Sequence, residues 1–182
     1  GWPARDAHRG AAQAAEADRL AGLRLRTVGS ITKLASDTAL KNALRAAAAT
    51  DEMRAAQLGV TLDRYMAPAE RECETRGFST PLSLAVVYDS MIHGSWDRIA
   101  ARVGKAATHG TSEKDWILTY VRTRHAWLTS IDRLRATAYR TRFFLGQIAV
   151  SNWQLKLPIV VNGVRLTSET FAGHRLGDEV KP

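Results

Sequence analysis

The sequence predicts a mainly α-helical protein with one small β hairpin near its C-terminus. Apolar residues recur at helical spacing through most of the 182 residues. Several of these stretches follow a Ser, Thr or Asp residue of the kind that caps a helix. The hairpin is indicated by Asn162-Gly163, which lies between two runs rich in β-branched residues. The length is sufficient for one domain with a buried core.

The predicted helices cover residues 11–28, 37–48, 51–67, 81–93, 95–103, 113–128 and 132–151. Gly29-Ser30 should break the first, Ala-rich run. Ser36 or Asp37 is expected to cap the second helix, and Thr50 the third. Pro68 should end or kink that third helix because a proline has no N–H to donate.

The helix at 81–93 is the most apolar in the chain. Thr80 suits the N-cap, Pro81 suits the first helical position, and Gly94 can stop the helix. Because apolar side chains lie nearly all round it, this helix should be buried in the centre of the domain. The chain from Ser168 onward is polar and is expected to be loose.

Apolar content, the N-terminal residues and net charge limit the classes of protein to which this chain can belong. Hydrophobic residues make up 45% of the chain, and no apolar run approaches the 18 residues of a membrane span. The first six residues lack the apolar core of a signal peptide, so we expect a processed chain or one that starts partway into a longer product. The net charge of +8 suits either a solvated basic surface or an anionic polymer partner, which is then nucleic acid or bacterial cell wall.

Cys73 is the one cysteine of the chain, which excludes an intramolecular disulfide. It stands among Glu70, Glu72 and Glu74, whose charges disfavour a thiolate. We therefore expect a structural cysteine rather than a nucleophile.

Asp89 and His93 form the sharpest local feature, one turn apart on the most apolar helix. A carboxylate buried there needs a cationic or hydrogen-bonding partner, because an unpaired one costs several kcal/mol. The arginines on later helices that can supply it are Arg122, Arg124, Arg140 and Arg142. The pair then borders a functional site, forms a structural ion pair, or faces solvent. His93 alone suits a helix-end cap.

Asn152 and Trp153 stand near a predicted helix end. Trp153 suits either the core or a platform for a sugar ring. The sequence contains no Gly-rich phosphate loop, HExxH, zinc-ligand spacing or GxSxG, so we predict neither a metal nor a cofactor. A basic helix-turn-helix near residues 11–48 is only weakly indicated.

Three blocks of the chain resemble, in order and spacing, the chitosanase family and its peptidoglycan hydrolase relatives in the lysozyme-like superfamily. The most specific combination is a Tyr-Asp-x-x-x-His-Gly helix at 88–94, a later Tyr139-Arg140 helix, and the Asn152-x-x-Leu155 segment. The blocks comprise residues 51–57 and 64–69, residues 78–94, and residues 116–124, 137–140, 152–155 and 158–163. The resemblance covers roughly residues 30–166, which divides the chain into an N-terminal helical segment (1–29), the domain (30–166) and a tail (167–182).

The resemblance implies a two-lobed, lysozyme-like α+β fold with a substrate cleft, and inverting hydrolysis of a β-1,4-linked amino-sugar polymer. In such enzymes a glutamic acid protonates the leaving oxygen and an aspartate activates water, with the two carboxyls about 6.5–9.5 Å apart. The family carries both near the N-terminus, ahead of a Gly-rich segment that this sequence does not show. Glu16 and Asp18 are a close pair in an Ala-rich helical pattern, and the catalytic carboxylates remain unassigned.

The resemblance also implies that Asp89, Arg140 and either Arg122 or Arg124 form a buried network that orients the general base. We therefore predict seven substrate-binding or positioning residues. They are Asp89, His93, Arg122, Arg124, Arg140, Asn152 and Trp153.

The charge of the chain bears on its substrate. Chitosan is polycationic and should be repelled by a net charge of +8, so peptidoglycan is favoured, and with it a secreted or cell-wall-associated protein. Two other interpretations stay open. One is a non-catalytic cell-wall-binding module of the same fold, and the other is a basic helical domain that binds nucleic acid.

Overall fold

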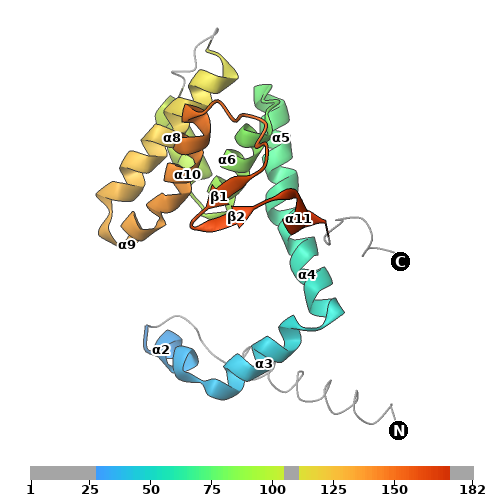
Figure 1. Ribbon diagram of the computed structural model, residues 1–182. Helices are drawn as coiled ribbons and strands as arrows, with labels where there is room; N and C mark the ends of the chain where they lie inside the picture. The colour runs from blue at the N-terminus through green and yellow to red at the C-terminus, as the bar shows by residue number, and fades with distance from the viewer. Residues whose placement is uncertain (1–27, 105–110, 173–182) are drawn as a thin grey trace. The chain divides into compact units, whose positions relative to one another are not determined.

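The structure is a computed structural model, and it describes residues 28–104 and 111–172. The predicted helix at 11–28 and the pair Glu16 and Asp18 lie outside this part, apart from Val28. The chain divides into two compact units between Leu58 and Gly59. The elements are α2 (Val28–Ser36), α3 (Thr38–Ala48), α4 (Asp51–Thr61), α5 (Ala67–Arg76), α6 (Pro81–Ile92), α7 (Trp96–Val103), α8 (Glu113–Ser130), α9 (Asp132–Arg135), α10 (Tyr139–Ala149), β1 (Ile159–Val161), β2 (Val164–Leu166) and α11 (Ser168–Phe171) (Figure 1).

The first unit contains α2, α3 and most of α4. Asp37 caps α3, since its Oδ1 accepts a 2.9 Å hydrogen bond from the backbone N–H of Leu40. This confirms the predicted start of the helix. The break predicted at Gly29-Ser30 is wrong, because both residues lie inside α2. A glycine inside a helix costs only about 0.5–1 kcal/mol relative to alanine, which the rest of the helix can offset.

The helical run that begins at α4 passes through Pro68 rather than ending there. Thr50 caps α4 as predicted, its Oγ1 accepting from the N–H of Met53 at 3.2 Å. A π-helical turn, Leu62–Met66, then leads into α5, which ends at Gly77 with φ 69°. Because the proline has no N–H for the carbonyl four residues earlier, the wider turn just before it changes the hydrogen-bond spacing and lets the helix continue.

Helix α6 is the centre of the second unit, as predicted. It packs against α5, α7, α8 and α10, and Figure 1 shows it between α5 and α8. Leu82, Val86 and Val87 are completely buried on it. Thr80 is the N-cap, with its Oγ1 accepting from the N–H of Ser83 at 3.3 Å, and Pro81 takes the first helical position. Apolar residues nearly all round α6 therefore become core on several sides.

An aromatic cluster fills the core between α6, α7 and α8. The ring of Trp116 stacks on that of Tyr120 with centroids 5.4 Å apart, and Trp96 lies 4.8 Å from Tyr120. The guanidinium of Arg76 covers Trp116 at 4.8 Å from its ring centroid. These contacts fix α7 and α8 against each other.

Helix α8 starts at the predicted cap, where the Oγ of Ser112 accepts from the N–H of Asp115 at 3.2 Å. The single helix predicted at 132–151 is interrupted. It consists of α9, a 3-10 turn at Ala136–Ala138, and α10. The turn tightens the backbone just before Tyr139, where α10 begins.

The C-terminal hairpin is confirmed. Strands β1 and β2 are antiparallel, with Val161 opposite Val164. Asn162 and Gly163 have φ values of 49° and 85°, which are those of a type I′ turn. The prediction of a loose chain from Ser168 is wrong for α11, which a capping box at Thr167 holds in place, and residues 173–182 lie outside the described part. None of the described helices combines the length and apolarity needed to cross a bilayer.

Candidate functional site

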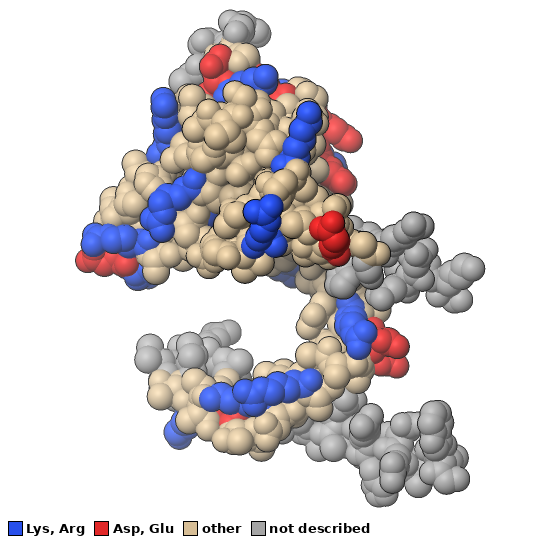
Figure 2. Space-filling view, in the orientation of Figure 1, with Lys and Arg blue, Asp and Glu red and all other residues tan. Residues whose placement is uncertain are grey.

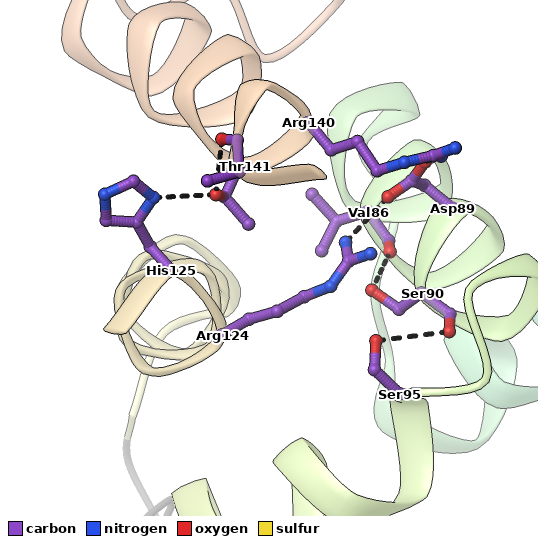
Figure 3. A network of polar contacts seen from close by, with 9 residues as sticks. Val86, Asp89, Ser90, Ser95, Arg124, His125, Arg140 and Thr141 are labelled. Carbon is purple, nitrogen blue, oxygen red and sulfur yellow. Dashed lines mark hydrogen bonds and ion pairs between the residues drawn. The ribbon is translucent and has the colours of Figure 1, made fainter. Parts of the chain in front are cut away.

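Asp89 on α6 holds two arginines from two other helices (Figure 3). Its Oδ2 accepts a 2.7 Å hydrogen bond from Nη1 of Arg124 on α8. Its Oδ1 accepts a short one from Nη1 of Arg140 on α10. The Arg124 side chain is fully buried, and those of Asp89 and Arg140 are 17% and 29% exposed. This confirms the predicted pairing of Asp89 with an arginine.

Asp89 alone neither neutralises the charge of both arginines nor accepts hydrogen bonds from all of their N–H groups. Two guanidinium groups face one carboxylate, which leaves a net charge of +1. Nε and Nη2 of Arg124 and Nε of Arg140 are buried without an acceptor among the described residues. Because a buried N–H without a partner costs about 1–3 kcal/mol, these groups favour a second acceptor beside Asp89.

Hydrogen bonds on both sides of the network join the helices that carry it. Beside it, the Ser90 hydroxyl donates to the carbonyl of Val86 at 2.6 Å, and the Ser95 hydroxyl to the carbonyl of Ser90 at 3.4 Å, which ties α6 to the start of α7. Next to Arg124 on α8, His125 turns the other way and meets the Thr141 hydroxyl at 2.8 Å (Figure 3). That contact joins α8 to α10 and fixes the spacing of the two helices that carry the arginines.

His93 ends α6 next to the network. Its backbone N–H donates to the carbonyl of Asp89 at 3.1 Å, so it takes the helix-end position that the sequence predicted. Burial lowers the pKa of its imidazole, and Arg124 and Arg140 lower it further. The ring is therefore neutral at neutral pH, and its buried Nδ1 meets no partner among the described residues.

Three other predicted residues stand apart from Asp89. Arg122 is exposed on the opposite side of α8 from Arg124, because two residues turn a helix by more than half a circle. Asn152 closes the end of α10, where its Nδ2 donates to Oε1 of Gln147 and its Oδ1 accepts from the N–H of Lys156, both at 2.8 Å. Trp153 is 8% exposed and belongs to the core. Its position favours the core interpretation over a sugar platform.

Cys73 is buried in the core as the sequence led us to expect. Burial raises the pKa of its thiol to about 11, and Glu113 and Glu72 add to that shift. The thiol is therefore protonated at neutral pH, as a structural cysteine is expected to be.

Glu113, the first residue of α8, makes a polar contact that the sequence did not predict. Its carboxylate accepts from the Ser83 hydroxyl at 2.5 Å, from the N–H and hydroxyl of Thr80 at 2.9 and 2.8 Å, and from the Ser79 hydroxyl at 3.0 Å. It thereby caps the beginning of α6 from another helix. The acidic first turn of α8 was the available signal, but it indicated only an interaction with the dipole of its own helix.

Protonation of Glu113 should loosen the junction of α6 and α8. Burial acts to raise the pKa of this carboxyl, but hydrogen bonds from Ser83, Thr80 and Ser79 outweigh it and lower the pKa from 4.5 to about 2. A carboxyl with a lowered pKa contributes stability that is complete above pH 4.5 and is lost as the pH falls towards 2. Glu113→Gln should therefore lower the free energy of unfolding at pH 7 by about 2 kcal/mol, and less at pH 3.

Urea unfolding at pH 7 and pH 3 measures this difference. Glu74→Gln, which removes an exposed carboxylate from α5, is the matched control and should change the free energy of unfolding little at either pH. An equal loss for Glu113→Gln at both pH values would contradict the assignment.

The carboxylates of Asp89 and Glu113 are engaged in contacts within the protein. Among residues 28–104 and 111–172, no three His, Cys, Asp or Glu side chains lie close enough together to hold a metal ion. Hydrolysis of a glycosidic bond by an acid and a base requires two carboxyls. Asp89 is bound by two arginines, and Glu113 is bound by hydroxyls of a helix start, so neither is placed as a proton donor.

Comparison with known proteins identifies a family. The family model for glycosyl hydrolase family 46 matches residues 17–159, which is most of the chain. This match includes α6, α8 and α10 and confirms the resemblance found in the sequence. Searches of curated proteins and of solved structures gave no match.

Proposed function

Because the chain belongs to glycosyl hydrolase family 46, the chitosanase family, we propose that it is the helical body of an enzyme that hydrolyses a β-1,4-linked amino-sugar polymer with inversion. The observation that carries this proposal is the network of Asp89, Arg124 and Arg140. Its Arg124 side chain is fully buried, and the network keeps buried N–H groups for a further acceptor.

In this proposal the network positions the carboxylate that acts as general base. A positive charge within about 4–6 Å stabilises an ionised carboxylate and lowers its pKa. Asp89 fixes the directions of both guanidinium groups, and their open N–H groups then hold the base in one orientation. The base removes a proton from water while a carboxylic acid on the other face of the sugar protonates the leaving oxygen. Arg124 and Arg140 are positioning residues in this scheme.

We favour peptidoglycan over chitosan as the substrate. The chain has a net charge of +8, and chitosan is a polycation, so their association is opposed by long-range repulsion. Peptidoglycan has the same β-1,4 linkage between amino sugars but carries carboxylates. A secreted or cell-wall-associated protein follows from this choice of substrate.

Release of reducing ends from purified peptidoglycan, and from chitosan in parallel, tests the function. We expect release from peptidoglycan, and NMR of fresh product should show the α anomer first, since the β linkage is inverted. No release from either polymer would overturn the proposal. Binding to peptidoglycan without release would instead support a non-catalytic wall-binding module.

A further inference from the structure

The charges of the C-terminal half are strongly biased. Between Trp116 and Thr167 the sequence contains a single acidic residue, Asp132, and eight basic ones. The basic residues are Arg122, Arg124, Arg133, Arg135, Arg140, Arg142, Lys156 and Arg165. This segment, which comprises most of α8, α9, α10, the loop after α10 and the hairpin, therefore carries a net charge of +7, from eight basic residues and one acidic one.

Most of these cations make no ion pair with the residues that the structure describes. Arg124 and Arg140 are held by Asp89, and Arg135 pairs with Asp132 at 2.6 Å. The other five are exposed and make no ion pair with a described carboxylate. They are Arg122, Arg133, Arg142, Lys156 and Arg165, and we call them the basic face. In Figure 2, lysine and arginine side chains are spread over the side formed by α8, α10 and the hairpin, and acidic side chains lie at its margins.

Helix α5 shows that the bias is local. There the cations alternate with Glu70, Glu72 and Glu74, and Arg76 pairs with Glu72 at 2.6 Å. Charges arranged in this way cancel at a short distance, whereas a surface of one sign produces a potential that extends over about 8–10 Å at physiological salt. The basic face therefore attracts polyanions and α5 does not.

We propose that the basic face binds the carboxylates of peptidoglycan. This inference rests on the proposed function, because it takes the polymer to be the one that the enzyme cleaves. A surface of positive charge favours a ligand that is a polyanion. Single-stranded nucleic acid fits less well, since it is bound by stacking on exposed rings, and every aromatic side chain of α8 and α10 is buried or half-buried.

The test compares two triple variants of the whole chain in sedimentation with cell-wall sacculi. Arg122→Gln/Arg142→Gln/Arg165→Gln removes three charges from the basic face. Arg64→Gln/Arg71→Gln/Arg102→Gln removes three exposed charges from the π-helical turn, α5 and α7. We expect the first variant to bind about tenfold more weakly at low salt, since it loses three exposed ion pairs with the polyanion. The second should stay within about twofold of the wild type.

Sacculi stripped of their phosphate polymers should bind as intact sacculi do, and loss of binding to them would overturn the choice of peptidoglycan. Duplex and single-stranded DNA serve as competing ligands. Equal weakening by both variants, or no weakening by the first, would overturn the inference, as would tighter binding to DNA than to sacculi. Hydrolysis is measured separately. Binding that depends on the basic face without hydrolysis would count against the proposed function alone, and hydrolysis without such binding would count against the basic face alone.

Discussion

Replacing Asp89 by asparagine should lower the free energy of unfolding by about 3–5 kcal/mol, because it leaves two guanidinium groups without their counter-charge. The Arg124 side chain is fully buried and has no route to water. Arg140 is 29% exposed and can turn its head group outward. Most of the loss should therefore come from Arg124. Urea unfolding followed by far-UV circular dichroism measures the change.

Asp97→Asn is the matched control, since it makes the same substitution at an exposed position of α7. It should change the free energy of unfolding by less than about 0.5 kcal/mol. Asp89→Leu/Arg124→Met removes the buried carboxylate together with the fully buried cation, and should be more stable than Asp89→Asn. A loss below about 1 kcal/mol for Asp89→Asn would mean that the network is a weak surface pair.

Arg140→Gln should reduce the rate of glycan hydrolysis by about a hundredfold, the cost of letting a reacting group move by roughly 1 Å. The amide keeps a hydrogen-bond donor near Asp89 but removes the charge and the open Nε–H. Because Arg124 still neutralises Asp89, the variant should fold. The readout is initial release of reducing ends from peptidoglycan at saturating substrate, and the loss should appear in kcat rather than in KM.

Arg102→Gln is the control, because it removes an exposed charge from α7 without touching the network. It should keep the rate of the wild type. Thermal unfolding of both variants separates a loss of positioning from a loss of fold. A wild-type kcat for Arg140→Gln would exclude Arg140 from positioning.

The need of Asp89 for a partner was predictable, but the identity of the partner was not. A lone carboxylate on an almost wholly apolar helix must find a cation, and this argument requires no coordinates. Choosing between Arg122 and Arg124 requires the rotational phase of α8, whose apolar residues are too evenly spread to define one face. Arg140 was assigned by resemblance to the family alone.

Contacts between distant parts of the chain explain what sequence reasoning missed. Glu113 lies 30 residues or more from the side chains that it binds, and only the packing of α6 against α8 brings them together. The helix around Pro68 was missed for a different, local reason. A proline inside a helix is expected to end or kink it, but here the π-helical turn before Pro68 lets the helix continue. Trp153 was ambiguous for a similar reason, because a tryptophan near a helix end serves in a core as readily as at a surface.

The acid limb of the pH–rate profile tests most directly whether the network acts on a catalytic carboxylate. If Arg140 stabilises the ionised general base, Arg140→Gln raises the pKa of that base, and the acid limb of kcat/KM moves up by about one pH unit. Arg140→Lys restores the charge and should move the limb back. An acid limb at the same pH in the wild type and in Arg140→Gln would contradict the account and leave the network a purely structural role.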